Sequence, residues 1–232
     1  MSLDIVDSDN FGGTRIDSSK WDTNGFWYSP GSTSAGGADL DNSSQCTLDG
    51  KGHFVLTGVR RASPSHSWLS CMIESAPESG RTGIDLTPPF YVVFSAQLPA
   101  PGPGLWPALY LLHDPDLSPR YQEADVMESR GFPDLFWTTW HPNIYQELSH
   151  GPFGGVDLSD GYHTFGIYMT ETRLRWYFDG RQVGAAIPIV DPGHFFIVIA
   201  LGVGSATSWS GPADSLTPSP SIFKLNYVHV YR

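Results

Sequence analysis

The chain has 232 residues and a formal net charge of −11, and 40% of its residues are hydrophobic. This length and apolar content suffice for a packed core. The acidic balance argues against a nucleic-acid or anionic-membrane partner, because phosphate groups are bound by basic patches. No apolar run is long enough to cross a bilayer.

Short β-rich segments, separated by turns that contain glycine or proline, follow one another along the chain. Glycine or proline interrupts nearly every window of a dozen residues, so no helix is expected. Regular short strands of this kind predict an all-β antiparallel sandwich or barrel, and no linker divides residues 1–232, which are expected to form a single domain. The expected strands are 53–59, 68–74, 90–98, 105–112, 121–128, 135–141, 162–170, 173–178, 195–203 and 222–231.

The two cysteines, Cys46 and Cys71, leave two states open. A disulfide between them would contribute about 3 kcal/mol by constraining the unfolded chain, and two buried free thiols are the alternative. Two cysteines at this spacing make no zinc site of the CxxC type. The charged fraction of 16% and the four methionines are typical of a secreted protein, so an extracellular location is expected.

Three carboxylates fall within six residues of one expected strand. Because side chains alternate along a strand, Tyr121, Glu123 and Asp125 share a face, whereas Glu128 lies at an odd offset. A β-bulge at Val126-Met127 would return Glu128 to that face, and bulges are frequent beside active sites. Retaining glycoside hydrolases use two carboxyl groups about 5–5.5 Å apart, and repulsion keeps one of them protonated. On spacing alone, a solvated acidic strand or a calcium site is the alternative.

Segment 123–128, which reads Glu-Ala-Asp-Val-Met-Glu, resembles the bulged E-x-D-x-x-E signature of glycoside hydrolase family 16. This form of the signature is typical of laminarinase-like endo-1,3-β-glucanases. Three other segments resemble strands of that family in the right order, and the resemblance extends over nearly the whole chain. They are 98–112 (LP…GLWPALYLL), 162–180 (YHTF…RLRWYFDG) and 226–231 (NYVHVY).

The resemblance implies a β-jelly-roll sandwich of two antiparallel sheets, with a glycan lying along a concave cleft. It implies that Glu123 is the nucleophile, Asp125 the assisting carboxylate and Glu128 the general acid/base. The expected activity is retaining, endo-acting hydrolysis of β-1,3-glucan by double displacement through a covalent glycosyl-enzyme intermediate. Two alternatives stay open: the same fold acting on mixed-linkage glucan or a galactan, and a non-catalytic β-glucan-binding module.

Aromatic side chains on the carboxylate-bearing faces are candidates for sugar binding, because sugars stack on aromatic rings and bond to polar groups. Strand alternation nominates some of them, and the family pattern adds a loop tryptophan and a glutamine where relatives often carry asparagine. The candidate substrate-binding residues are Trp106, Tyr110, Tyr121, Trp137, His141, Trp209 and Gln45.

The expected strand 135–141 carries a histidine, His141, that matches a family position beside the catalytic strand. If His141 faces the cleft, alternation places Trp137 and Thr139 there too, and Trp140 points into the core.

No cofactor is required by this chemistry. Family members often bind a structural calcium ion, but Asn226 stands where the family motif has aspartate, and no metal is predicted. His141 has no second ligand at metal-binding spacing. The expected partner is a polysaccharide, with no nucleic acid and no membrane, and the protein is expected to be a monomer.

Overall fold

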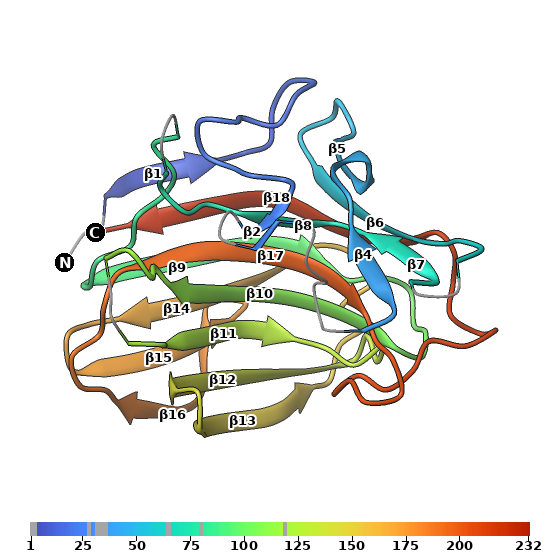
Figure 1. Ribbon diagram of the computed structural model, residues 1–232. Helices are drawn as coiled ribbons and strands as arrows, with labels where there is room; N and C mark the ends of the chain where they lie inside the picture. Colours follow the sequence, from blue (N-terminus) through green and yellow to red (C-terminus); the bar gives the residue numbers. More distant parts are fainter. Residues whose placement is uncertain (1–3, 27–28, 31–36, 64–65, 79–80, 118–119) are drawn as a thin grey trace.

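The computed structural model consists mainly of two sheets stacked face to face, which confirms the expected all-β sandwich (Figure 1). Among the described residues no helix could span a bilayer. The structure describes residues 4–26, 29–30, 37–63, 66–78, 81–117 and 120–232.

The larger sheet has ten strands, which pair antiparallel except for one parallel contact between β4 and β7. Two further short strands lie outside the main strand order, and one pairs with β18 and the other with β6. The main order is β16 (Arg181–Pro188), β15 (Arg173–Phe178), β14 (His163–Met169), β9 (Phe90–Gln97), β18 (Ser221–Tyr231), β6 (Phe54–Arg60), β7 (Trp68–Ser70) and β4 (Asp39–Asp41), with β1 (Ile5–Asp9) on β18 and β5 (Cys46–Leu48) on β6.

The smaller sheet has six antiparallel strands, and its centre carries the acidic segment. A two-stranded hairpin and one 3₁₀ turn complete the described secondary structure. The order in the smaller sheet is β13 (Gln146–Gly154), β12 (Leu135–Asn143), β11 (Glu123–Glu128), β10 (Leu105–His113), β17 (Phe195–Val203) and β8 (Met72–Glu74); the hairpin is β2 (Gly25–Phe26) with β3 (Ser29–Pro30), and the turn is η1 (Ser43–Gln45).

The main core lies between the two sheets and is built by strand alternation. In β17 every second side chain enters this core, whereas the intervening ones join a smaller apolar cluster on the other face of the sheet. Burial of each of the larger apolar side chains contributes about 1.5–3 kcal/mol. The core residues of β17 are Phe195, Ile197, Ile199 and Leu201, and those of the smaller cluster are Phe196, Val198 and Ala200.

The expected strand 68–74 is interrupted at Cys71, and its two halves belong to different sheets. β7 pairs with β6 in the larger sheet, and β8 pairs with β17 in the smaller one. Cys71 forms a disulfide with Cys46, with a Cα–Cα distance of 5.3 Å. Of the two cysteine states that the sequence leaves open, the structure therefore has the disulfide, which ties β5 to the crossover between the sheets.

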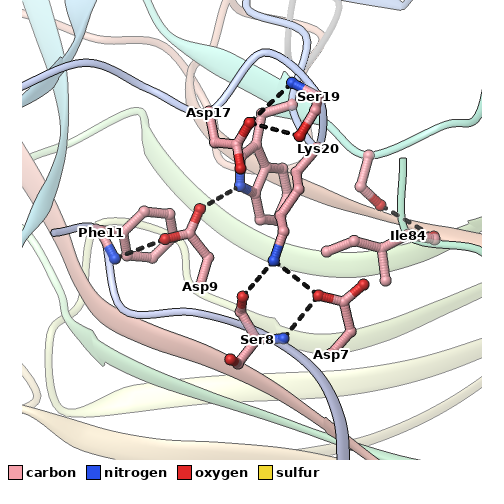
Figure 2. A network of polar contacts seen from close by, with 10 residues as sticks. Asp7, Ser8, Asp9, Phe11, Asp17, Ser19, Lys20 and Ile84 are labelled. Carbon is pink, nitrogen blue, oxygen red and sulfur yellow. Dashed lines mark hydrogen bonds and ion pairs between the residues drawn. The ribbon is translucent and has the colours of Figure 1, made fainter. Parts of the chain in front are cut away.

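The N-terminal strand β1 is fixed by a polar network around one ammonium group (Figure 2). Lys20 Nζ donates to Asp7 Oδ1 at 2.8 Å and to the Ser8 carbonyl oxygen at 2.5 Å. The Trp21 indole donates to Asp9 Oδ2 at 2.8 Å. These bonds attach the loop after β1 to the strand, and β1 itself pairs with β18.

Candidate active site

Strand β11 contains the bulge that the sequence predicts. Met127 pairs with Leu109 of β10, whereas Asp125 pairs with the very next residue of β10, so Val126 has no partner there. On the β12 side, the register shift falls between Asp125 and Glu128. The bulge consequently places Ala124, Val126 and Met127 in the core, although the last two are neighbours in sequence.

The bulge brings all three carboxylates to the outer face of the smaller sheet, where they line one cleft of about 400 Å³. Four of the candidate binding residues line the same cleft, together with polar residues from β12 and β13. The lining residues are Trp106, Glu123, Asp125, Glu128, Trp137, Thr139, His141, Glu147, Ser149 and Trp209.

The bulge is anchored from the opposite sheet. The Trp176 indole, on β15, donates a hydrogen bond of 2.8 Å to the backbone carbonyl oxygen of Asp125. Trp176 is 1% exposed, and the ring of His150 packs edge-on against it at 5.5 Å. Because an unpaired buried carbonyl costs about 1–3 kcal/mol, this bond stabilises the irregular backbone that carries Asp125.

Glu128 has a pKa well above the ordinary glutamate value. The main cause is removal of its carboxyl group from bulk water, and the second is the negative charge of Asp125. The Trp106 indole donates to Glu128 Oε1 at 2.8 Å and opposes these effects in part. Glu128 is therefore protonated at pH values where a surface glutamate is ionised, as a general acid requires.

Asp125, between the two glutamates, is 2% exposed, and its pKa is also well above the usual range. Burial is the main cause, followed by the charge of Glu123, a hydrogen bond with Glu123 and the charge of Glu147. His141 Nε2 lies 3.2 Å from Asp125 Oδ2. Asp125 can thus hold a proton between Glu123 and the histidine.

Glu123 receives a hydrogen bond from the hydroxyl group of Tyr121. A donor of this kind stabilises the ionised carboxylate. Across the sheet, Glu123 pairs with His141 on β12. Glu123 and Glu128 therefore have different environments: the first has a hydroxyl donor, and the second is desolvated beside another acid.

Three tryptophans lie together in the lining of the cleft. The ring of Trp209 lies 5.4 Å from that of Trp106 and 5.2 Å from that of Trp137. Trp209 remains 37% exposed. Aromatic rings of this kind present apolar faces on which sugar rings stack, while the polar groups of the cleft can bond to hydroxyls.

Alternation in β12 is as the sequence predicts, since His141, Trp137 and Thr139 line the cleft and Trp140 is buried in the core. Two cleft residues on the next strand, Glu147 and Ser149, do not follow from the sequence. Nearly all side chains of β13 are exposed, so its sequence lacks the alternation that reveals a strand. The Ser149 hydroxyl lies 3.2 Å from that of Thr139.

Three predicted binding residues lie outside the cleft lining. Tyr110 is 8% exposed within the smaller apolar cluster, and its hydroxyl lies 3.8 Å from the sulfur of Met72. Gln45 ends η1, and its amide donates to Ser44 Oγ. Tyr121 touches the site through Glu123. Among the described residues, no group of three or more His, Cys, Asp or Glu side chains is arranged to hold a metal ion.

No protein-family model matches the chain. It is 24% identical, over 265 aligned positions, to the glucan endo-1,3-β-glucosidase A1 of Niallia circulans, covering 99% of this chain and 38% of that protein. The X-ray structure of an endo-β-1,3-glucanase from Pyrococcus furiosus superposes with a TM-score of 0.81 at 25% identity, covering 99% of this chain and 94% of that one. The chain is homologous to the glycoside hydrolase family 16 endo-1,3-β-glucanases and has their fold.

A second curated relative is named for two linkages. An endo-1,3-1,4-β-glycanase of Rhizobium meliloti is 31% identical over 55% of this chain and 27% of that protein. The chain thus spans about two fifths or less of the length of these two curated relatives. The family 16 fold agrees with the jelly roll that the E-x-D-x-x-E resemblance implies.

Proposed function

We propose that the protein is a retaining endo-β-1,3-glucanase in which Glu123 and Glu128 are the two catalytic carboxyl groups. The observation that carries the proposal is that these two carboxyl groups line the same cleft but have different surroundings. Glu123 accepts a hydrogen bond from a hydroxyl group, whereas burial and the charge of Asp125 raise the pKa of Glu128. Two carboxyl groups whose environments separate their protonation states are what glycoside hydrolysis needs.

In the first step, a carboxylate oxygen of Glu123 attacks the anomeric carbon of the glycan. The bond from that carbon to the glycosidic oxygen breaks, and Glu128 donates its proton to the departing oxygen. The product is a glycosyl ester on Glu123 and a shortened glycan with a new hydroxyl group. The Trp106 indole, which bonds Glu128 Oε1, fixes the position of the acid during this transfer.

In the second step, the ionised Glu128 takes a proton from a water molecule. The resulting hydroxide attacks the anomeric carbon and displaces the Glu123 carboxylate, so the configuration is retained after two inversions. Asp125, which hydrogen-bonds Glu123, stabilises the charge that returns to this carboxylate. His141 holds Asp125 in place through the contact of 3.2 Å.

The sugar-stacking surface of the proposed site consists of Trp106, Trp137 and Trp209. We also propose substrate-binding roles for Tyr110, Tyr121 and Gln45. Tyr110 and Gln45 would act from outside the cleft lining, by supporting its walls. We further propose an extracellular, monomeric protein without a cofactor. The disulfide Cys46–Cys71 supports the location, because disulfides persist in oxidising compartments.

Mixed-linkage β-1,3-1,4-glucan is the second candidate substrate, and the name of the Rhizobium meliloti relative favours it. The test is release of reducing sugar from laminarin, curdlan, lichenan, xyloglucan and agarose. Short β-1,3-linked oligosaccharides from laminarin support the proposal. Activity on another polymer alone retains the two-carboxyl mechanism and changes the substrate. Binding of glucan by folded protein without hydrolysis of any polymer would overturn the enzymatic assignment in favour of a binding module.

A further inference from the structure

A second pocket lies immediately beyond Trp209. Its volume is about 540 Å³, and its walls come from loops 101–103, 130–132 and 210–216. The guanidinium carbon of Arg130, which lines this pocket, is 4.9 Å from the ring centre of Trp209, which lines the cleft. The two hollows therefore share one wall, built from a cation and an indole ring.

The walls of this pocket are rigid because backbone packs directly on backbone. The Gly102 amide donates to the Gly131 carbonyl oxygen at 3.2 Å. A Cβ atom on Gly131 would lie 2.0 Å from the Gly102 carbonyl oxygen, and one on Gly104 would lie 2.3 Å from the Ala213 nitrogen. Only glycine allows these approaches, so the loops hold one arrangement and the pocket is preformed.

The chemistry of the pocket suits a sugar. Phe132 and Leu216 are 55% and 76% exposed and give it an apolar surface. Arg130 and Asp214 add charged groups to the lining. A hydrocarbon ligand would cover these groups without bonding to them, whereas a sugar offers an apolar face and hydroxyl groups together. An anionic ligand would meet the carboxylate of Asp214 in the same pocket.

We propose that this pocket is an additional glycan-binding site, which holds a sugar unit of the polysaccharide whose other units occupy the cleft. The inference rests on the proposed function, because it takes the cleft as the place of cleavage. The chain would pass over Trp209, stack one unit on Phe132 and bond its hydroxyls to Arg130. Longer glycans would then gain affinity and turnover that short ones cannot.

The test is Phe132→Ala, assayed on β-1,3-gluco-oligosaccharides from the trisaccharide to the octasaccharide and on laminarin. Because the ring is exposed, its removal leaves the core intact. We expect kcat/KM on the longest oligosaccharides to fall about tenfold, the loss of one stacking contact, with no change on the shortest. Val190→Ala, which removes an 83% exposed side chain outside the pocket lining, is the matched control.

Equal losses on every length, or no loss on any, would overturn the pocket as a binding site. Failure of the proposed function is distinguishable, because it appears as absence of hydrolysis in the unaltered protein. In that event, calorimetric titration of the unaltered protein and of Phe132→Ala with the trisaccharide and the octasaccharide decides the inference. A Phe132-dependent gain in affinity for the octasaccharide supports the pocket, and equal affinities in both proteins contradict it.

Discussion

Strands β11 and β13 contribute carboxyl groups to the same cleft in opposite ways. β11 lies inside its sheet, is bulged, and is anchored by Trp176 from the other sheet, so Asp125 and Glu128 are desolvated. β13 is the edge strand of that sheet, and Glu147 stands exposed on it. The comparison teaches that burial next to another acid, rather than residue type, raises the pKa of a carboxyl group, and that the interior of the sheet supplies both conditions at Asp125 and Glu128.

The largest effect is expected from neutralising the two glutamates of β11. Glu123→Gln removes the nucleophile and Glu128→Gln removes the acid, so each is expected to lower kcat on laminarin by roughly 10³-fold or more. Steady-state kinetics with circular dichroism checks activity and fold together. Glu171→Gln, an exposed glutamate on a distant turn, is the matched control and should be fully active. Near-normal activity in either glutamate variant would contradict its assigned role.

The second-largest effect is expected from loss of the Trp176 hydrogen bond that anchors the bulge. Trp176→Phe keeps an aromatic ring but removes the donor to the Asp125 carbonyl oxygen, at a cost of about 1–3 kcal/mol in stability. Because the loosened bulge carries the catalytic groups, we expect kcat to fall at least tenfold with KM nearly unchanged. Trp140→Phe, equally buried in the core, is the control. Equal kcat losses in both variants would show that Trp176 acts through packing alone.

The same two strands show how far the sequence predicts the structure. On β11 the alternation, the odd offset of Glu128 and the bulge at Val126-Met127 follow from the sequence, because its apolar residues must enter the core. On β13 only His150 and Phe153 are partly buried and the other side chains are exposed, so the pairing of this edge strand, and with it Glu147, leaves no periodic signal. The strand β16 is absent from the predicted elements for the same reason, because it is mostly exposed. The strands β1, β4 and β5 are absent because they are too short to show a period, and the buried residues of β4 are aspartates.

Contacts between segments that are distant in the chain also cannot be predicted from the sequence. The break at Cys71, the Trp176 anchor and the Arg130–Trp209 contact depend on how sheets and loops meet in space. Tyr110 is an example in which alternation correctly predicts the face of the sheet on which the side chain lies. It does not predict the smaller apolar cluster that encloses this side chain. Periodicity predicts the face of a side chain, whereas its exposure depends on what packs above it.

Asp125→Asn is expected to reduce kcat about tenfold, less than loss of either glutamate, because an amide can still hydrogen-bond Glu123. Its effect on stability has a definite sign. The raised pKa means that folded protein keeps a proton that the unfolded chain loses above about pH 3.9. The free energy of unfolding therefore falls as pH rises from that value towards the raised pKa. Asparagine removes this penalty.

Thermal unfolding across pH measures the effect. The stability of Asp125→Asn relative to the unaltered protein should be greater at neutral pH than at pH 4. Asp160→Asn, which makes the same change of atoms at an exposed aspartate, is the control. A difference that does not change with pH would show that Asp125 is not desolvated in the folded protein.

The smallest effect is expected at the edge strand. The charge of Glu147 raises the pKa of Asp125, as the last of four causes. Glu147→Gln should therefore move the upper end of the pH-dependent fall in stability to lower pH and slightly increase the free energy of unfolding at neutral pH. Because Glu147 is exposed, high salt should abolish the shift. In an Asp125→Asn background the substitution should produce no shift at all, since the titrating group is gone. A shift that persists in the Asp125→Asn background would mean that Glu147 acts on another carboxyl group of the cleft. The difference between β11 and β13 would then come from the groups that surround each carboxyl group rather than from burial.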